Sequence, residues 1–555
     1  MALDDDAISN PTCNPSLEGI LARAVSRRGV LKAGAGSAAL AFLAGRASEA
    51  RAATGGSFTP LPVSTADAVI VPPELEAEVL YAWGDPISDG PAFLPDASNS
   101  VADQEQQAGM HHDGMHFFAL ESEGGVTTRG LLVVNHEYTD DGLLHPDGML
   151  TWTAEKVRKS QAAHGVSVIE LALRGDRWEV VRPSRYARRV TGYTPCNIAG
   201  PAAGSPALRT SADPTGRSVL GTLNNCAHGY TPWGTYLACE ENFNGYFVNA
   251  AGTPASTDQT RYGLGAGFGY RWHEFDARFD LSAEPNEANR FGWVVEIDPF
   301  DPEAAPVKRT ALGRFKHEGA WVVVARDLRV VVYMGDDERG EYIYKFVSKL
   351  PWPAARLRRR SPVDEGTLYV ARLDAGAVSG DLEGTGRWLE LTYGKNGLDA
   401  TNGFMSQADV VTFARRAADV AGATRMDRPE WIAVHPKTRE VYCTLTNNSR
   451  RGTTFPVDEA NPRTNNVFGH ILRWRESGSD PRAKSFKWDV FVLCGDPSNP
   501  DPNKQGNIVG DAFGSPDGLW FDDDGRLWIQ TDISTSALNQ GDYANIGNNQ
   551  MLCAD

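Results

Sequence analysis

Short apolar runs that end in polar residues recur along the whole chain. Residues 131–134 and 330–334 are two such runs, and each leads directly into acidic or amide side chains. Residues 235–239, 441–446 and 527–530 repeat the pattern. Runs of this length, rich in Val, Leu and Tyr, predict β-strands rather than helices.

Turn-forming residues stand ahead of several runs. Residues 325–328, 435–439 and 521–526 have the Asp, Pro and Gly content of hairpin turns. Residues 296–299 and 471–474 add strand-like segments between the repeats. The 56 glycines and 33 prolines also favour an all-β chain. Repeated strand–turn–strand units are typical of β-propeller blades, and we predict a β-propeller with insertions over the alternative, a β-sandwich with polar loops.

The polar ends of the strands have a chemical consequence in such a fold. Strands arranged radially would aim their acidic ends at one central channel. Hard cations such as calcium take six to eight oxygen ligands, which carboxylates and amide carbonyls supply. Any single acidic pair is more simply a solvated surface feature. Five such clusters together predict a pocket for several metal ions.

The N-terminus carries an export pattern. A twin-arginine motif is followed by a mild apolar stretch over residues 33–44 and a small-x-small cleavage site at residues 50–52; the motif reads Ser26-Arg27-Arg28-Gly29-Val30-Leu31-Lys32. The stretch is too short and too weakly apolar for a permanent membrane anchor. We expect a cleaved signal peptide over residues 1–52 and a propeller over residues 53–555. The twin-arginine machinery would deliver the protein to the periplasm or the exterior.

The net charge limits the classes of binding partner, and the cysteine content limits the kinds of site that the chain can form. The net charge of −17 argues against nucleic acid or an anionic membrane as the main partner. Seven cysteines are present, with no C-x-x-C pair: Cys13, Cys196, Cys226, Cys239, Cys443, Cys494 and Cys553. Disulfides, buried thiols and a single thiolate ligand all remain open for the six beyond the signal peptide.

Several motifs resemble those of one enzyme family. The longest runs from Asn225 through Cys226 and His228 to Glu240-Glu241; shorter ones lie at residues 113–115, 135–138, 317–319, 428–430 and 515–520. Together they resemble the PhoX-type alkaline phosphatases. The resemblance implies a six-bladed propeller with a mixed cluster of ferric iron (Fe3+) and calcium (Ca2+). It also implies hydrolysis of small-molecule phosphate monoesters, with release of inorganic phosphate.

The resemblance assigns roles to individual residues. Cys226 would be the thiolate ligand to iron, and Arg428 would hold the phosphate beside Glu430. The carboxylate ligands would be Glu240 or Glu241, Glu318, Glu430 and Asp517. Cys196 is a rival thiolate, and His317 is either a general acid or a structural histidine. The spacing of His111, His112 and His116 fits no specific zinc motif, and at most one should touch the site.

These roles agree with the chemistry of phosphate esters. The transition state spreads negative charge over the equatorial oxygens, which metal ions neutralise. The guanidinium of Arg428 offers a planar, permanently charged fork that matches phosphate. If residues 428–430 form a strand, alternation puts Arg428 and Glu430 on the same side.

The end of the chain leaves closure of the propeller open. Residues 551–554 have the pattern of a strand start, just before the last residue, Asp555. We expect either that the sequence is truncated at its C-terminus or that an N-terminal strand around residues 68–81 closes the ring. Two other functions also fit the sequence. One is a calcium-dependent propeller hydrolase of lactones or phosphotriesters, and the other is a non-catalytic, calcium-stabilised binding propeller.

Overall fold

The computed structural model describes residues 59–554, which form a mostly β structure. The predicted signal peptide of residues 1–52, with Arg27, Arg28 and Cys13, lies outside the described residues. No helix within them combines the length and apolar character needed to cross a bilayer.

The strands form four sheets. The first sheet contains β1 (His112–Glu123), β2 (Val126–His136), β3 (Gly165–Arg174), β4 (Arg177–Val180) and β5 (Arg188–Val190). The second contains β6 (Pro195–Ala199), β7 (Ser218–Leu220), β8 (Asn225–Tyr230), β9 (Tyr236–Glu240), β10 (Val294–Ile297) and β11 (Val307–Arg309). The last contains β21 (Pro516–Phe521), β22 (Leu527–Thr531) and β23 (Met551–Ala554).

The third sheet has nine strands and consists of two antiparallel halves. One half contains β12 (Trp321–Val324), β13 (Arg329–Gly335), β14 (Ile343–Pro351) and β15 (Gly366–Ala375). The other contains β17 (Pro429–Val434), β18 (Val441–Leu445), β19 (His470–Glu476) and β20 (Ser485–Leu493). Strand β16 (Glu383–Glu390) joins them, because it pairs with β15 along one edge and with β20 along the other.

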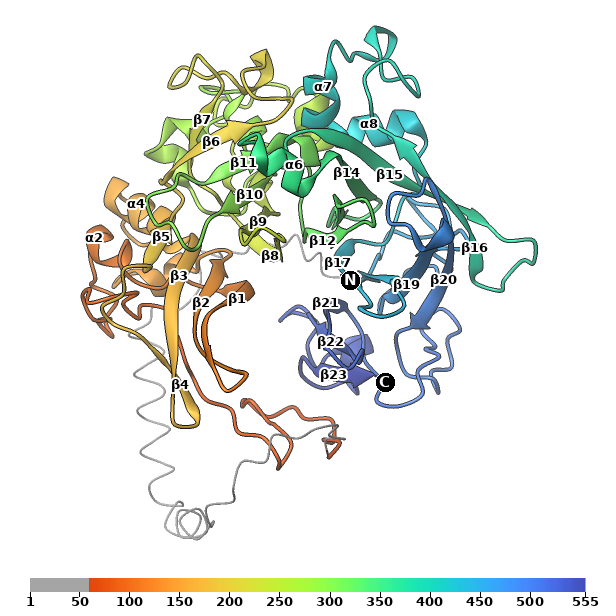
Figure 1. The fold of residues 1–555 in the computed structure, drawn as a ribbon, viewed down its shortest axis with the longest axis horizontal. Helices are drawn as coiled ribbons and strands as arrows, with labels where there is room; N and C mark the ends of the chain where they lie inside the picture. The colour runs from red at the N-terminus through yellow and green to blue at the C-terminus, as the bar shows by residue number, and fades with distance from the viewer. Residues whose placement is uncertain (1–58, 555) are drawn as a thin grey trace.

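The three remaining sheets and these two halves give five β units around a common centre (Figure 1). The first strand of each leading hairpin lies nearest the middle: β1, β8, β12, β17 and β21 (Figure 1). We call these five the inner strands. Neighbouring inner strands approach one another in chain order, from β1 through β8, β12 and β17 to β21.

Adjacent units pack face to face through separate apolar cores. Strand β13 shows how one strand serves two of them, because its side chains alternate between its faces. Val330 and Val332 join a core with Leu237 of the second sheet, whereas Val331 packs with Val434 of the following unit. The alternation that predicted strands therefore also fixes the order of the units around the centre.

The predicted strands and hairpin turns are confirmed. All five apolar runs lie within or largely overlap strands β2, β9, β13, β18 and β22, and the three predicted turns connect β12 to β13, β17 to β18, and β21 to β22. Residues 296–299 and 471–474 overlap the ends or interior of β10 and β19.

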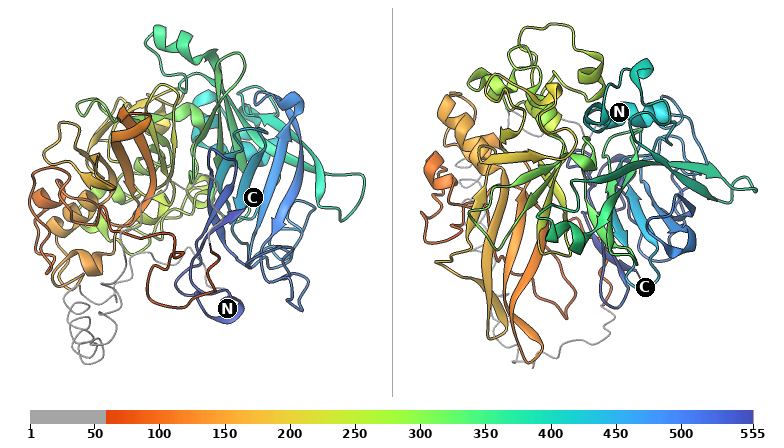
Figure 2. Two further views of the ribbon diagram at one scale, coloured as in Figure 1. Left: turned by 60° about the horizontal axis from the view of Figure 1, so that its bottom comes forward. Right: turned by 45° about the horizontal axis from the view of Figure 1, so that its top comes forward.

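Short helices connect the strands, mostly on the outside of the ring (Figure 2). They are α2 (Val101–Gln104), α3 (Asp141–Leu144), α4 (Ala154–Ala163), α5 (Thr257–Arg261), α6 (Trp352–Leu357), α7 (Gln407–Thr412) and α8 (Ala414–Ala421). The 3-10 helices are η1 (Pro206–Leu208), η2 (Phe243–Tyr246), η3 (Trp272–Glu274), η4 (Ala277–Phe279), η5 (Glu287–Arg290), η6 (Thr310–Leu312), η7 (Ala400–Asn402), η8 (Ser477–Ser479) and η9 (Gly541–Tyr543).

The prediction of a strand around residues 68–81 is wrong. This segment is irregular apart from a short turn at Pro73 and Glu74 and bends at its ends, and the adjacent prolines Pro72 and Pro73 lack the N–H donors that a ladder requires. The preceding residues instead contact the connection before β23. The backbone N–H of Asn548 donates to the carbonyl of Ser64 at 2.9 Å, and its side-chain amide donates to the carbonyl of Ala66 at 2.7 Å.

Candidate metal centre

The same backbone conformation recurs at the starts of the inner strands. In four of them a non-glycine residue with positive φ stands two positions before an acidic residue or a cysteine. These are His111 (φ 47°), Asn224 (φ 49°), Arg428 (φ 57°) and Ser515 (φ 50°), which precede Asp113, Cys226, Glu430 and Asp517. Left-handed backbone is unfavourable for such residues and clusters at functional sites.

A register irregularity follows each left-handed residue. The ladders shift between His112 and Met115, Asn225 and His228, Pro429 and Ile432, and Pro516 and Leu519. Bulges of this kind bend a strand and redirect a side chain. Each shift spans the acidic residue or cysteine named above, so the same local distortion turns all four side chains toward one place.

The ends of the second strands bring further carboxylates to the same edge. Glu137 follows β2, Glu241 follows β9, and Asp337 follows β13. An antiparallel hairpin places the end of its second strand beside the start of its first. Glu318 joins them from just before β12, where its backbone N–H donates to the carbonyl of Gly335 at 3.3 Å.

Seven side chains from these positions form one continuous cluster. Three groups have ligand atoms within 4.8 Å of one another: Asp113, Glu137 and Cys226; Cys226, Glu241 and Glu318; and Glu318, Glu430 and Asp517. Cys226 and Glu318 each belong to two groups and so link all three. We call these seven residues the metal-site cluster.

The distances within the metal-site cluster fit a set of metal ligands. The Sγ atom of Cys226 lies 3.1 Å from Oδ2 of Asp113 and 3.0 Å from Oε1 of Glu318. One S–H cannot donate to both carboxylates in full. Oε1 of Glu241 and Oδ1 of Asp517 are buried without a hydrogen-bond partner. Buried polar atoms normally have a partner, and bound cations would supply one here.

The electrostatics point the same way. Removal from water and the neighbouring acids raise the pKa of Asp113 to about 6. The same two causes raise the pKa values of Glu318 and Glu430 well above their ordinary range. Burial raises the pKa of the Cys226 thiol well above its usual value, and the acids around it add to the effect. Bound cations reverse this preference, because they stabilise carboxylate and thiolate.

Arg428 lies at the edge of the cluster and is held in place. Its Nε and Nη2 atoms donate to the two carboxylate oxygens of Asp337 at 2.8 and 2.7 Å. Nη2 also lies 3.1 Å from Oε1 of Glu430, so the two side chains lie on the same side, although Arg428 precedes β17 and has a left-handed backbone (φ 57°) in place of the strand conformation that the prediction assumed. The guanidinium is therefore a fixed, permanent positive charge beside the proposed ligands.

The structure separates the two adjacent glutamates. Glu241 lies in the metal-site cluster, whereas Glu240 points into the interior of the second sheet. Oε1 of Glu240 lies 2.7 Å from Nζ of Lys308, and Oε2 accepts a hydrogen bond from the backbone N–H of Trp293 at 3.1 Å. Consecutive strand residues face opposite sides, which accounts for the difference.

The other candidates lie apart from the cluster. Cys196 is buried in an apolar core, where burial raises its pKa to about 12. His317 stacks on Phe315 at 3.7 Å, its Nε2 lies 2.8 Å from the carbonyl oxygen of Gly313, and its Nδ1 is buried without a hydrogen-bond partner. No ligand group among residues 59–554 includes His111, His112 or His116. The described cysteines are all free thiols, with Cys553 exposed and the others buried.

Sequence reasoning did not assign roles to Asp113, Glu137 or Asp337. The first two stand in motifs that the sequence displays, but acidic residues alone did not identify them as ligands. The detectable signal is positional. Residues 111–113, 224–226, 428–430 and 515–517 occupy equivalent places at the starts of inner strands.

Comparison with known proteins gives consistent results. A family model described as alkaline phosphatase PhoX matches residues 56–555. A solved structure of Pseudomonas fluorescens PhoX in complex with vanadate, a transition state analogue, resembles the chain with a TM-score of 0.86 and 52% sequence identity. The match covers 90% of this chain and 87% of that chain. Among curated proteins, none matches.

Proposed function

The chain belongs to the PhoX alkaline phosphatase family and is a phosphate monoester hydrolase; we propose that its metal-site cluster holds ferric iron and calcium and that Arg428 binds the phosphate group. The observation that carries this proposal is the thiol of Cys226 within about hydrogen-bond distance of two carboxylates, with four more acidic side chains in the same cluster.

The ligand types support two kinds of metal. Thiolate is a soft ligand that favours transition metals, so Cys226 with Glu241 and Glu318 would hold iron. The oxygen-only group of Glu318, Glu430 and Asp517 suits the hard calcium ion. Bound metals supply charge neutralisation and an acidified oxygen nucleophile.

Arg428 supplies a positive charge for the phosphate group beside the acidic cluster. A phosphate monoester is strongly anionic, and the carboxylates alone would repel it. The two hydrogen bonds from Arg428 to Asp337 fix the guanidinium plane before substrate arrives, so little orientation remains to be lost on binding. Arg428 stands directly before β17 and Asp337 shortly after the end of β13, so both partners of the contact adjoin strands of the third sheet.

The proposed fold and location extend the family assignment. We also propose the six-bladed propeller that the family resemblance implies; the radial arrangement of the β units in the described residues supports a propeller, and a crystal structure would test the number of blades. We also propose twin-arginine export to the periplasm or the exterior. Replacing both Arg27 and Arg28 with Lys should trap the precursor in the cytoplasm, and unchanged export of that variant would exclude the route.

Metal analysis combined with a phosphatase assay tests the function directly. The purified protein should contain iron and calcium, absorb visible light, and release phosphate from an aryl phosphate. Vanadate should inhibit this turnover. A fully metallated protein with no turnover of aryl phosphates would overturn the proposal, and calcium without iron would overturn the assignment of Cys226.

A further inference from the structure

Helix α6 lies at the end of the ring that points away from the metal-site cluster. The strand before it, β14, pairs with β13 from Gly335, beside the cluster, to Arg329, beside a hairpin turn. At about 3.3 Å per residue, this strand spans roughly 25 Å. The backbone N–H of Trp352 donates to the carbonyl of Leu328 at 2.8 Å, which holds the start of α6 beside that turn. We call this end of the ring the turn end.

Residues 356–360 form a basic, exposed segment at the turn end, which we call the arginine tip. Its sequence is Arg-Leu-Arg-Arg-Arg, and all five residues are exposed, with Leu357 at 88%. In the part of the chain that the structure describes, the side chains of Arg356, Arg358 and Arg359 make no ion pair or hydrogen bond. Three cationic side chains and an apolar one are therefore available to a partner.

The shape and chemistry of the arginine tip fit a lipid surface. Five consecutive exposed residues project from the protein, because a helical segment that lay against it would bury every third or fourth side chain. A projecting segment has no groove for a peptide, but it can reach a flat surface. Arginine pairs well with phosphate, which phospholipid headgroups carry. Leu357 can enter the boundary between headgroups and acyl chains, as the apolar residues of interfacial helices do.

We propose that the arginine tip docks this protein on a membrane surface that contains anionic phospholipid. The contact is peripheral, because no helix among the described residues is long and apolar enough to cross a bilayer. Clusters of four or more basic residues are typical of segments that bind anionic lipid, and the tip has four arginines in five positions.

The net charge of −17 argues against an anionic membrane as the main partner, but it is an average over the whole chain. At about 0.1 M salt, exposed charges more than about 10 Å from a surface are largely screened. The nearest acidic residues in the sequence, Asp364 and Glu365, pair with Arg309 and Arg360. A membrane at the turn end would therefore respond mainly to the arginine tip.

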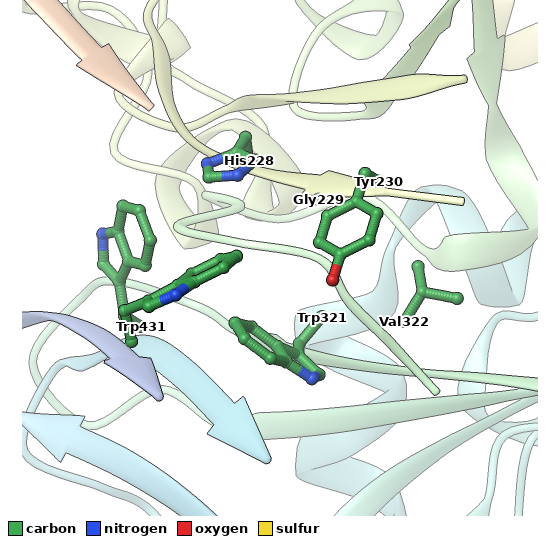
Figure 3. A pocket seen from close by; sticks show the side chains of 7 residues that line it. His228, Gly229, Tyr230, Trp321, Val322 and Trp431 are labelled. Carbon is green, nitrogen blue, oxygen red and sulfur yellow. The ribbon is translucent and has the colours of Figure 1, made fainter. Parts of the chain in front are cut away.

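Docking at the turn end would not cover a route to the metal-site cluster between the inner strands. Aromatic side chains fill the space between β8, β12, β17 and β21 on this side of the cluster. Figure 3 shows the rings of His228, Tyr230, Trp321 and Trp431 around one small cavity. Its volume of about 10 Å³ has room for about one water molecule. A phosphate ester cannot pass through it, so the membrane would leave the approach to the cluster from the opposite end free.

Sedimentation with lipid vesicles tests the proposal on the exported protein, once its N-terminus has been determined so that no signal segment contributes. The protein should bind phosphatidylcholine vesicles that contain about one third phosphatidylglycerol, but not vesicles of phosphatidylcholine alone. An arginine near an anionic surface contributes about fivefold to binding, so the triple variant Arg356→Ala, Arg358→Ala, Arg359→Ala should bind about 100-fold more weakly. Leu357→Ala should bind about tenfold more weakly, because less apolar surface is buried.

A matched control removes the same charge elsewhere. Arg372, Arg387 and Arg475 are exposed on β15, β16 and β19, where each pairs with an acidic side chain. Their joint replacement by Ala should change vesicle binding less than about twofold, because the change in net charge is the same but lies outside the arginine tip. The melting temperature of each variant reports its folding without reference to phosphatase activity.

Several results would overturn the proposal. Equal binding to neutral vesicles, or no binding to anionic ones, would exclude anionic lipid as the partner. An equal loss in the control variant would show a response to net charge alone. Binding of the tip to poly-glutamate without binding to anionic vesicles would assign the surface to an acidic protein instead. Vesicle binding is measured without turnover, so its outcome is independent of the proposed phosphatase function.

Discussion

Neutralising Glu240 and neutralising Glu241 should have opposite effects, although the two residues are adjacent. Glu241→Gln removes a proposed metal ligand, so the variant should lose bound metal and turnover. Glu240→Gln leaves the metal-site cluster intact but breaks the buried ion pair with Lys308. That variant should keep its full metal content and instead lose folding stability.

The size of the Glu240 effect follows from burial. The side chains of Glu240 and Lys308 are both 0% exposed, and Nζ of Lys308 also donates to the carbonyl of Arg290 at 2.8 Å. Removing one partner of a buried pair typically costs about 3–5 kcal/mol, because the other charge stays in the interior. Burial already raises the pKa of Glu240 and lowers the pKa of Lys308, so the pair itself only partly offsets its desolvation. Glutamine keeps the shape and an acceptor, and we expect the lower end, about 3 kcal/mol.

Urea unfolding of the metal-free proteins measures this cost without interference from metal binding. Metal-free Glu240→Gln should unfold at lower urea, whereas metal-free Glu241→Gln should match or exceed the wild type because one charge has left a crowded cluster. Elemental analysis of the metal-loaded proteins supplies the second measurement. Loss of metal from Glu240→Gln with no loss of stability would refute the assignment of the two glutamates.

Three further predictions concern the cluster. Arg428→Lys should keep its metals but lose about 30- to 1,000-fold in kcat/KM, because an ammonium group lacks the planar fork that engages Asp337. This loss is the equivalent of roughly 2–4 kcal/mol for one preorganised donor. A parallel loss of metal would show that Arg428 is structural. Cys226→Ser should lose iron and visible absorption before calcium, and retained iron would exclude the thiolate ligand. The raised pKa of Asp113, about 6 against roughly 3.9 unfolded, gives stability to the metal-free protein that is complete below pH 4 and disappears as the pH rises through 6. Its melting temperature should therefore fall more between pH 4.5 and 7.5 than that of Asp113→Asn, and added calcium should restore it; identical pH profiles would contradict this.

Much of the fold could be predicted from local pattern. Runs such as residues 330–334 alternate between two buried faces, and the turn residues 325–328 mark the hairpin before them. The positions of the strands could therefore be predicted from the sequence. The joining of two units through β16 could not be predicted, because the pairing of β16 with β20 depends on residues about 100 positions apart. Residues 68–81 were mistaken for a strand, since apolar residues alone do not show whether a partner strand is present.

The site was predicted where chemistry is unusual and missed where it is ordinary. A cysteine among acids at Cys226 and the Arg428–Glu430 pair stand out in any sequence. Glu240 and Glu241 could not be distinguished, because their difference depends on which face of β9 each side chain takes as the strand ends. Asp337 was missed because its role comes from a contact with Arg428, 91 residues later.

The double pairing of β16 also bears on how the ring would come apart. Because β15, β16 and β20 share one continuous ladder, neither of the two units it joins can open without exposing amides of the other. Native-state hydrogen exchange should therefore find these two units to be a single cooperative foldon, with one protection level. Within the described residues no strand ladder of this kind joins the units built on β1, β8 and β21 to their neighbours, so we expect each of them to show a protection level of its own. Glu318 and Glu430 belong to the two joined units and would therefore keep a fixed position relative to each other. Asp113, Cys226 and Asp517 belong to the other units, so their distances to Glu318 and Glu430 would vary more.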